Sequence, residues 1–236
     1  MKNKNYKVID KEEAVANWWR DDAYIYLREK TTDEIYRLKV EYDDWAANPR
    51  EWDNLCTIFS QRGNWDIGDK GFSYPKDEAP NKYEEYKERQ ERGEIFMVPI
   101  YVYEHSGMTI SLSSFGDPWD SGVGAFIFVE KKRVFAELEG VTEENWRQKA
   151  YRAMEQEVDI YDQYIRGEVY GWCIEKAEEV KHKRKSDGKT WTSIEWEQED
   201  GCGGYYGDPE ESGLFDDAVG NRFDYIEDLD ITERPF

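Results

Sequence analysis

The chain has 236 residues, of which 39% are apolar, 16% are aromatic and 36% are charged. A disordered chain is poor in aromatic residues, so this composition predicts a folded protein. The net charge of −21 argues against binding to phosphate backbones or anionic membranes, because such binding needs Lys and Arg side chains. The same charge favours solubility and a basic partner.

Cellular location is constrained by what the sequence lacks. No segment approaches the roughly 18 apolar residues that a membrane-spanning helix needs, and residues 1–7 contain no apolar stretch like that of a signal peptide. Cys56, Cys173 and Cys202 are widely spaced, so they suggest neither a zinc site nor a disulfide framework. We therefore expect a cytoplasmic protein with free thiols, no cofactor and no membrane partner.

The N-terminal part of the chain carries strand patterns on both sides of a charged helix. The charged segment 82–92 predicts a helix that ends at Gly93. Gly and Pro residues before it predict a loop over 60–81. Strands are predicted where apolar residues alternate with polar ones or form short runs, at 24–27, 35–42, 95–103 and 124–129.

The clearest helix is predicted over 143–166, with Thr142 as its N-cap and Gly167 after its last turn. Its apolar residues recur at helical spacing, so they share one face of the helix. That face predicts the buried side chains, which are Trp146, Ala150, Ala153, Met154, Val158, Tyr161 and Ile165.

A β-hairpin is predicted after this helix. Its strands are 168–180 and 190–199, and the Asp-Gly pair at 187–188 suits the positive φ angles of the turn. The run 181–185 at its tip is the only dense basic cluster, and it belongs to a chain of net charge −21. We therefore expect no direct contact with nucleic acid. Together the elements predict an α+β fold, in which a mainly antiparallel sheet packs against one long helix and shorter helices.

Residues for catalysis or metal binding give weak signals. The sequence has only His105 and His182 and no G-x-S-x-G motif, so nucleophilic catalysis is not favoured. Acidic residues in loops could bind Mg²⁺ or Ca²⁺ through their carboxylates. They lie in no EF-hand motif, and capping of turns explains them more simply. These weak metal candidates are Asp66, Asp69, Asp117 and Asp120, to which a metal-dependent hydrolase would add Asp53.

The C-terminal segment 208–236 combines negative charge with apolar residues. It contains ten Asp or Glu residues and two Arg residues. A purely solvated tail would not need the Leu, Ile, Phe and Tyr side chains that are interspersed among them. We therefore expect the segment to dock, either on the body of the protein or on a partner.

Several motifs follow one another in a fixed order along the middle of the chain. They are NPREWDNLCT (48–57) with WDIGD (65–69), PIYVYEHSGMTIS (99–111), PWDSGVGAFIFV (118–129), and YDQYIRGEVYGW (161–172) followed by DGCGGYYG (200–207). In this order they resemble a family of uncharacterised bacterial proteins that phages, plasmids and integrated mobile elements carry. The resemblance implies no catalytic residues, but it implies a bacterial host. The stretch 59–64 lacks the histidine that family members often have there.

The resemblance covers roughly residues 45–207, and this extent suggests a division of the chain. The predicted parts are an N-terminal extension (1–44), an α+β core domain (45–207) and an acidic C-terminal segment (208–236). The first and last parts lie outside the resemblance, so they are expected to specialise this protein.

Charge and resemblance together predict a function. We expect an acidic mobile-element protein that binds and inhibits a host nucleic-acid-handling defence protein with a basic surface, as anti-restriction and anti-CRISPR proteins or nucleic-acid mimics do. Two alternatives stay open: a protein-binding module that uses aromatic patches, and an Asp-rich metal-dependent hydrolase. The predicted partner-binding residues are Glu210, Glu211, Asp216, Asp217, Asp224, Glu227, Asp228 and Asp230, with Phe215, Phe223 and Tyr225 as apolar anchors.

Overall fold

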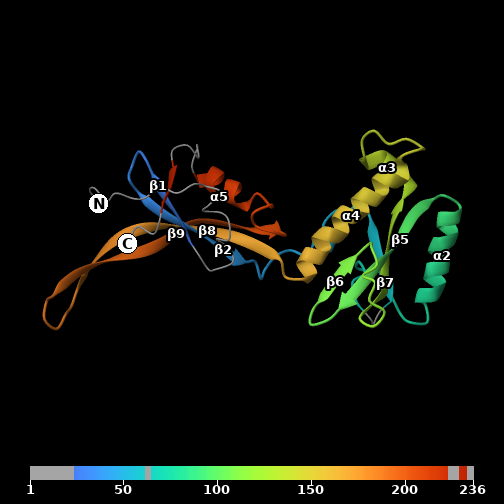
Figure 1. The fold of residues 1–236 in the computed structure, drawn as a ribbon, viewed down its shortest axis with the longest axis horizontal. Coiled ribbons are helices and arrows are strands. Elements are labelled where there is room, and N and C mark those ends of the chain that lie inside the picture. The colour runs from blue at the N-terminus through green and yellow to red at the C-terminus, as the bar shows by residue number, and fades with distance from the viewer. Residues whose placement is uncertain (1–23, 62–64, 223–228, 233–236) are drawn as a thin grey trace. The chain divides into compact units, whose positions relative to one another are not determined.

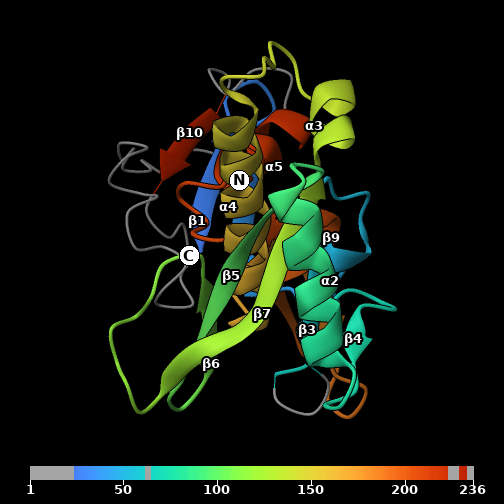
Figure 2. The same cartoon turned by 90° about the vertical axis from the view of Figure 1, so that its right-hand side faces the viewer.

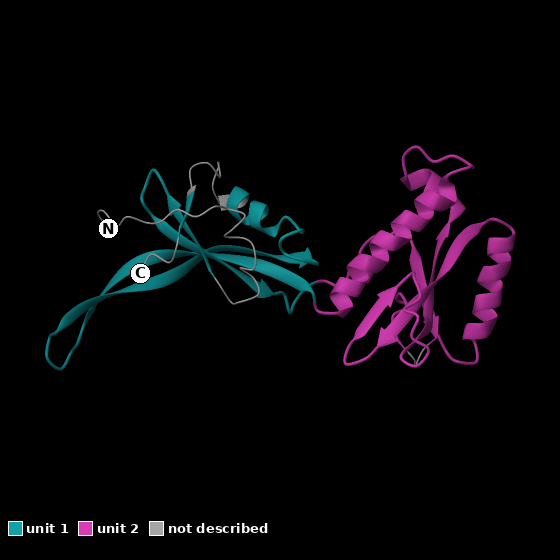
Figure 3. Cartoon of the chain, viewed as in Figure 1, with its two compact units in different colours: residues 1–46, 168–236 teal, residues 47–167 magenta. Residues whose placement is uncertain are grey.

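The chain divides into two compact units, shown in Figure 3. Unit 1 contains residues 1–46 and 168–236, and unit 2 contains residues 47–167. Each unit has a sheet and a hydrophobic core of its own. The structure is a computed structural model that describes residues 24–61, 65–222 and 229–232.

This division differs from the predicted parts 1–44, 45–207 and 208–236. Residues 168–207 belong to unit 1, because the strand that starts at Val169 hydrogen-bonds to the strand over 35–42. The two ends of the chain therefore share one unit, and unit 2 is inserted between two strands of that unit. The predicted boundaries came from the charge of the C-terminal segment and from the extent of the family resemblance. Neither of these shows which strands pair when they lie far apart in the sequence.

Unit 1 is built on a five-stranded antiparallel sheet with strand order β10-β1-β2-β8-β9 (Figure 1). The strands are β1 (Ile25–Glu29), β2 (Ile35–Tyr42), β8 (Val169–Lys183), β9 (Thr190–Tyr206) and β10 (Leu229–Thr232). Helix α5 (Leu214–Arg222) packs on one face. Side chains alternate between the faces of a strand, and those on the α5 side form the core. These are Ile25, Leu27, Tyr36, Leu38, Tyr170, Trp172 and Ile174.

The β8–β9 hairpin is longer than the sequence predicts. Only part of β8, from Tyr170 to Lys176, pairs with β2. From Ala177 to Lys183 it pairs with β9 alone among the described strands, so the two continue as a ribbon beyond the rest of the sheet (orange in Figure 1). We call residues 177–196 the arm. Gly188 in its turn has a φ of +69°, as predicted, whereas Asp187 does not adopt the positive φ that the Asp-Gly pair also predicted.

Unit 2 is built on a second five-stranded sheet, with strand order β4-β3-β7-β5-β6. Its neighbouring strands are antiparallel except for β3 and β4, which are parallel. The strands are β3 (Thr57–Gln61), β4 (Ser73–Tyr74), β5 (Ile95–Glu104), β6 (Met108–Ser111) and β7 (Ser121–Glu130).

The helices of unit 2 are the 3-10 helix η1 (Pro49–Glu51) and the α-helices α2 (Ala79–Glu91), α3 (Lys131–Glu137) and α4 (Trp146–Ile165). α4 begins three residues later than predicted. Its N-cap position is Asn145 and not Thr142, whose N–H donates to Asn145 Oδ1 at 2.8 Å in the turn before the helix. Across the described residues of both units, no helix is long and apolar enough to cross a membrane.

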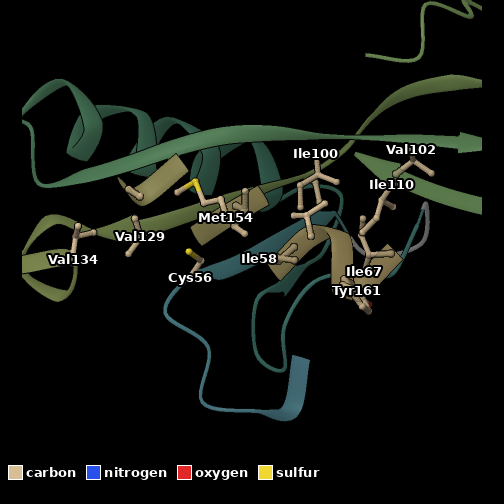
Figure 4. Packing of buried hydrophobic residues seen from close by; sticks show 14 of the residues in the cluster. Cys56, Ile58, Ile67, Ile100, Val102, Ile110, Val129, Val134, Met154 and Tyr161 are labelled. Atoms are coloured by element: carbon tan, nitrogen blue, oxygen red, sulfur yellow. The ribbon is translucent and has the colours of Figure 1, made fainter. Parts of the chain in front are cut away.

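Helices α4 and α2 cover opposite faces of this sheet (Figure 2). On the α4 side, five of the side chains predicted as buried are confirmed: Trp146, Ala150, Met154, Val158 and Tyr161. Figure 4 shows Met154 among strand residues such as Ile58 and Val129. On the α2 side, Tyr86 packs on Phe59 and Phe128, with ring centroids 4.7 and 4.6 Å apart.

The α+β class is confirmed, but the strands are arranged differently from the prediction. The strands predicted for one sheet belong to two: 35–42, 168–180 and 190–199 lie in unit 1, whereas 95–103 and 124–129 lie in unit 2. Because α4 packs on only one of these sheets, the predicted packing of one long helix on one sheet is not confirmed. Strand partners depend on packing between distant segments, which local patterns do not report.

Candidate functional site

The acidic segment docks on its own unit through α5. Leu214, Phe215, Ala218 and Val219 are buried on the side of α5 that meets the unit 1 sheet. Phe215, predicted as an anchor for a partner, is only 4% exposed. Its side chain instead helps to fix α5 to the sheet, so it does not lie on a surface that a partner could meet.

The carboxylates around the start of α5 face away from this core. The exposed residues are Glu210, Glu211, Asp216 and Asp217. Asp208 closes the turn before α5, since its carboxylate accepts from the Glu210 N–H at 2.8 Å. Asp217 accepts a hydrogen bond from the Tyr205 hydroxyl of β9. Burial raises the pKa of Tyr205 to about 12, so this hydroxyl stays a donor at neutral pH.

The remaining predicted partner-binding residues fall into two groups. Asp230 lies on β10, where its carboxylate pairs with Arg28 of β1 and lies 3.6 Å from the Lys30 ammonium. This pairing joins an edge strand to the sheet and gives Asp230 a structural contact. The residues outside the described part of the chain are Phe223, Asp224, Tyr225, Glu227 and Asp228.

Three of the weak metal candidates have other partners. Asp66 accepts from the Ser73 hydroxyl at 2.7 Å. Asp117 caps a turn by accepting from the N–H groups of Asp120 and Trp119, and these bonds lower the pKa of its carboxyl. Asp120 in turn lies 3.0 Å from the His105 ring. Within 24–61, 65–222 and 229–232, no group of three or more His, Cys, Asp or Glu side chains could hold a metal ion.

Asp69, the fourth loop candidate, belongs to a buried ion-pair network in unit 2. The Arg50 guanidinium donates two hydrogen bonds of 2.8 Å to Asp69 and one of 2.8 Å to Glu157 of α4. The Arg50 side chain is only 4% exposed. Asp69 also accepts from the Ile58 N–H, and Glu157 accepts from the Cys56 N–H. The network ties the NPREWDN and WDIGD motifs to α4, which is a structural role.

Residues of three motifs meet at one end of the unit 2 sheet. The Trp65 ring lies beside Gly122 and Gly124 of β7, and its indole N–H donates to Glu104 Oε2 at 2.7 Å. A Cβ atom on Gly124 would lie 2.9 Å from Trp65 Cε3 and would collide with Val102 Cγ2. The glycines of the SGVG sequence therefore make room for the tryptophan. Sequence reasoning found no purpose for these glycines.

Gly124→Ala is expected to destabilise the protein by about 1–3 kcal/mol, because the added methyl group overpacks Val102 and Trp65. Gly122→Ala, on the same strand, is the matched control, because its Cβ atom would meet Trp65 at 3.9 Å. The control should change the free energy of unfolding by less than about 0.5 kcal/mol. Urea denaturation followed by tryptophan fluorescence measures both variants, and equal losses would contradict the packing argument.

The same end of the sheet carries exposed aromatic side chains beside a His–Asp pair. His105 Nδ1 lies 3.0 Å from Asp120 Oδ2, and the His105 ring stacks on Tyr103 with centroids 6.3 Å apart. Phe115 packs beside Tyr103 with centroids 5.6 Å apart. Trp119, next to Asp120 in sequence, is 91% exposed. Exposed rings beside polar groups suit the binding of another protein.

Two surfaces are therefore candidate functional sites. The acidic surface of unit 1 consists of Glu210, Glu211, Asp216 and Asp217. The aromatic surface of unit 2 consists of Tyr103, His105, Phe115 and Trp119. Sequence reasoning found the first surface from its charge and missed the second, although the motifs over 99–111 and 118–129 contain three of its four residues. No protein-family model, no curated protein and no solved structure matches this chain.

Proposed function

We propose that this protein binds a basic nucleic-acid-handling protein in the cytoplasm of a bacterial host and inhibits it by competing with its nucleic acid. The acidic surface of unit 1 carries the proposal. α5 buries its apolar side chains against the sheet and turns its carboxylates outward. The carboxylates are thus held by a packed helix, so this segment does not have to become ordered, at an entropic cost, when a partner binds. The proposal places the protein with anti-restriction and anti-CRISPR inhibitors.

The proposed attraction acts first at long range. Duplex DNA carries one charge per ~1.7 Å of its axis, so a protein groove that holds DNA is basic and also attracts arrays of carboxylates. The net charge of −21 raises the rate of encounter with such a groove, and added salt lowers that rate. The resemblance to proteins of mobile elements supports a host defence protein as the target.

Charge reversal of the acidic surface tests the proposal. In Glu210→Lys/Glu211→Lys/Asp216→Lys, binding of the partner at low salt is expected to fall about ten-fold or more, because each attraction becomes a repulsion. The melting temperature should move little, since these side chains are exposed. Capture from host lysate at low salt identifies the partner, and titration with the purified partner measures the affinity.

The matched control reverses three exposed carboxylates of unit 2, in Glu139→Lys/Glu144→Lys/Glu155→Lys. It changes the net charge by the same amount, so it should slow association without removing a contact. Equal losses of affinity in the two triple variants would mean that the effect comes from net charge and not from contacts of the acidic surface. Unchanged binding by the first variant, or a partner that handles no nucleic acid, would contradict the proposal.

A second candidate function rests on the aromatic surface, as a protein-binding module that uses the exposed ring of Trp119. An exposure of 91% leaves the Trp119 ring available to a partner, and tryptophan is enriched among residues that dominate interface energies. Such binding would resist salt, because burial of apolar area does not depend on charge. Binding that survives high salt and is lost in Trp119→Ala would favour this function over competition by charge.

A further inference from the structure

The arm of unit 1, residues 177–196, is a surface that the proposed function does not use. Its register runs from Ala177 opposite Trp196 to Lys183 opposite Thr190. Most of its side chains are exposed. Figure 1 shows that it extends beyond the other strands of its sheet. A ribbon of this kind places its tip where a partner can reach both of its faces.

Charge is segregated along the arm. Glu178, Glu179 and Glu195 lie toward its base, and the basic residues lie at its tip. The basic residues are Lys181, Lys183, Arg184, Lys185 and Lys189. Arg184 pairs with Asp187 at 3.3 Å, whereas the four lysines form no ion pair within the part of the chain that the structure describes. Their charges are therefore available to an anionic partner.

The tip is shaped by hydrogen bonds and by one aromatic contact. The Arg184 N–H donates to the Lys189 carbonyl at 2.8 Å, and the Gly188 N–H donates to the Arg184 carbonyl at 2.9 Å. Below this turn, the rings of His182 and Trp191 stack across the strands with centroids 5.1 Å apart. Because side chains alternate along a strand, Lys181 and Lys183 share the face opposite to this stack.

Distance separates the tip from the acidic body of the unit. Lys176 is the last residue of β8 that pairs with β2, and Lys183 lies seven residues further along the strand. At about 3.4 Å per residue, the arm carries Lys183 about 24 Å beyond this pairing. The Debye length is about 8 Å at physiological ionic strength, so charges at the level of Lys176 are largely screened at Lys183.

We propose that the tip of the arm binds the phosphate backbone of B-form duplex DNA. Its lysines supply the charge that phosphate contacts require. The major groove of B-DNA is about 12 Å wide and admits a two-stranded β-ribbon, whereas the major groove of A-form RNA is too narrow for side chains to enter. Phosphates carry no sequence information, so the contact is independent of base sequence.

This inference replaces the expectation, drawn from net charge alone, that the protein does not touch nucleic acid. Net charge averages over the chain, whereas the arm places Lys183 about 24 Å, or about three Debye lengths, beyond the last pair of β8 with β2. The inference does not rest on the proposed function, because it uses none of the carboxylates around α5. The two surfaces would allow one copy to hold a DNA-binding protein through α5 and the flanking DNA through the arm.

Fluorescence anisotropy with a short labelled duplex tests the inference. With about three phosphate contacts, raising the salt from about 50 to about 200 mM should weaken binding about 40-fold. Lys181→Glu/Lys183→Glu/Lys185→Glu should weaken binding at the lower salt by about ten-fold or more. The control Lys70→Glu/Lys76→Glu/Lys132→Glu changes the net charge equally at exposed positions of unit 2, and it should stay within about three-fold of wild type.

Three outcomes would overturn the inference. One is the absence of binding by the wild-type protein at the lower salt, and another is an equal loss in the two triple variants. The third is tighter binding of the matching single strand, abolished by Trp191→Ala, which would assign the arm to base stacking instead of the duplex backbone. Circular dichroism of both triple variants shows whether each is folded, so that a loss of binding is not a loss of structure.

Discussion

Arg50→Leu is expected to lower the free energy of unfolding of unit 2 by about 3–5 kcal/mol. The Arg50 guanidinium is 4% exposed, and it compensates the carboxylates of Asp69 and Glu157, which are 15% and 14% exposed. A leucine would leave two neighbouring negative charges with little solvent and no counter-charge. Urea denaturation followed by circular dichroism measures the loss.

Two further variants separate buried charge from ordinary packing. Arg152→Leu removes an exposed arginine from α4, and it should change stability by less than about 0.5 kcal/mol. Arg50→Leu/Asp69→Asn/Glu157→Gln removes all three charges and should recover part of the loss, since no uncompensated charge remains. If this triple variant is no more stable than Arg50→Leu, the uncompensated carboxylates are not the cause.

The ion-pair network of Arg50 could not be predicted from the sequence. Asp69 lies 19 residues from Arg50 and Glu157 lies 107 residues away, and no local pattern pairs residues over such intervals. The same limit explains the division of the strands. The segments 35–42 and 95–103 were each predicted as strands from their own periodicity and are β2 and β5. Their partners depend on packing across the chain.

The candidate sites, too, were predictable only in the features that local sequence patterns report. The acidic segment was predictable as a docking segment, because its apolar residues had no purpose in a solvated tail. The docking of α5 on the sheet of its own unit was not predictable, because the sequence does not show whether Leu214 and Phe215 pack on this protein or on a partner. The arm was predictable as a hairpin from Asp-Gly at 187–188. Its length beyond the sheet was not, because that length depends on where β2 begins.

One feature of the sequence could have pointed to the aromatic surface. Gly122 and Gly124 of the motif PWDSGVGAFIFV lie in one strand, where glycine weakens packing unless another group approaches closely. The structure shows that the approaching group is the Trp65 ring, 59 residues before Gly124 in the sequence. A search for an aromatic partner for these glycines would have pointed to this end of the sheet, though not to the exposure of Trp119.

Met154→Asp is expected to destabilise unit 2 by about 4 kcal/mol or more. The Met154 side chain is fully buried between α4 and the sheet, among apolar neighbours such as Ile58 and Val129 (Figure 4). The change removes apolar packing and places an unpaired carboxylate there, and each effect alone costs several kcal/mol. Gln156→Asp, at an exposed position of the same helix, introduces the same side chain and should cost less than about 1 kcal/mol.

The pH dependence of this loss identifies its cause. Burial disfavours the charged form, so the carboxyl of the introduced aspartate has a higher pKa in the folded state than its value of about 3.9 in the unfolded chain. Its cost relative to wild type is therefore smallest below the unfolded pKa, grows as the pH rises toward the folded pKa, and is constant above it. Thermal melts of both proteins between about pH 4 and pH 7 measure this difference. A deficit that does not change with pH would assign the loss to packing alone, and a melting temperature within a degree or so of wild type at neutral pH would place Met154 outside the core.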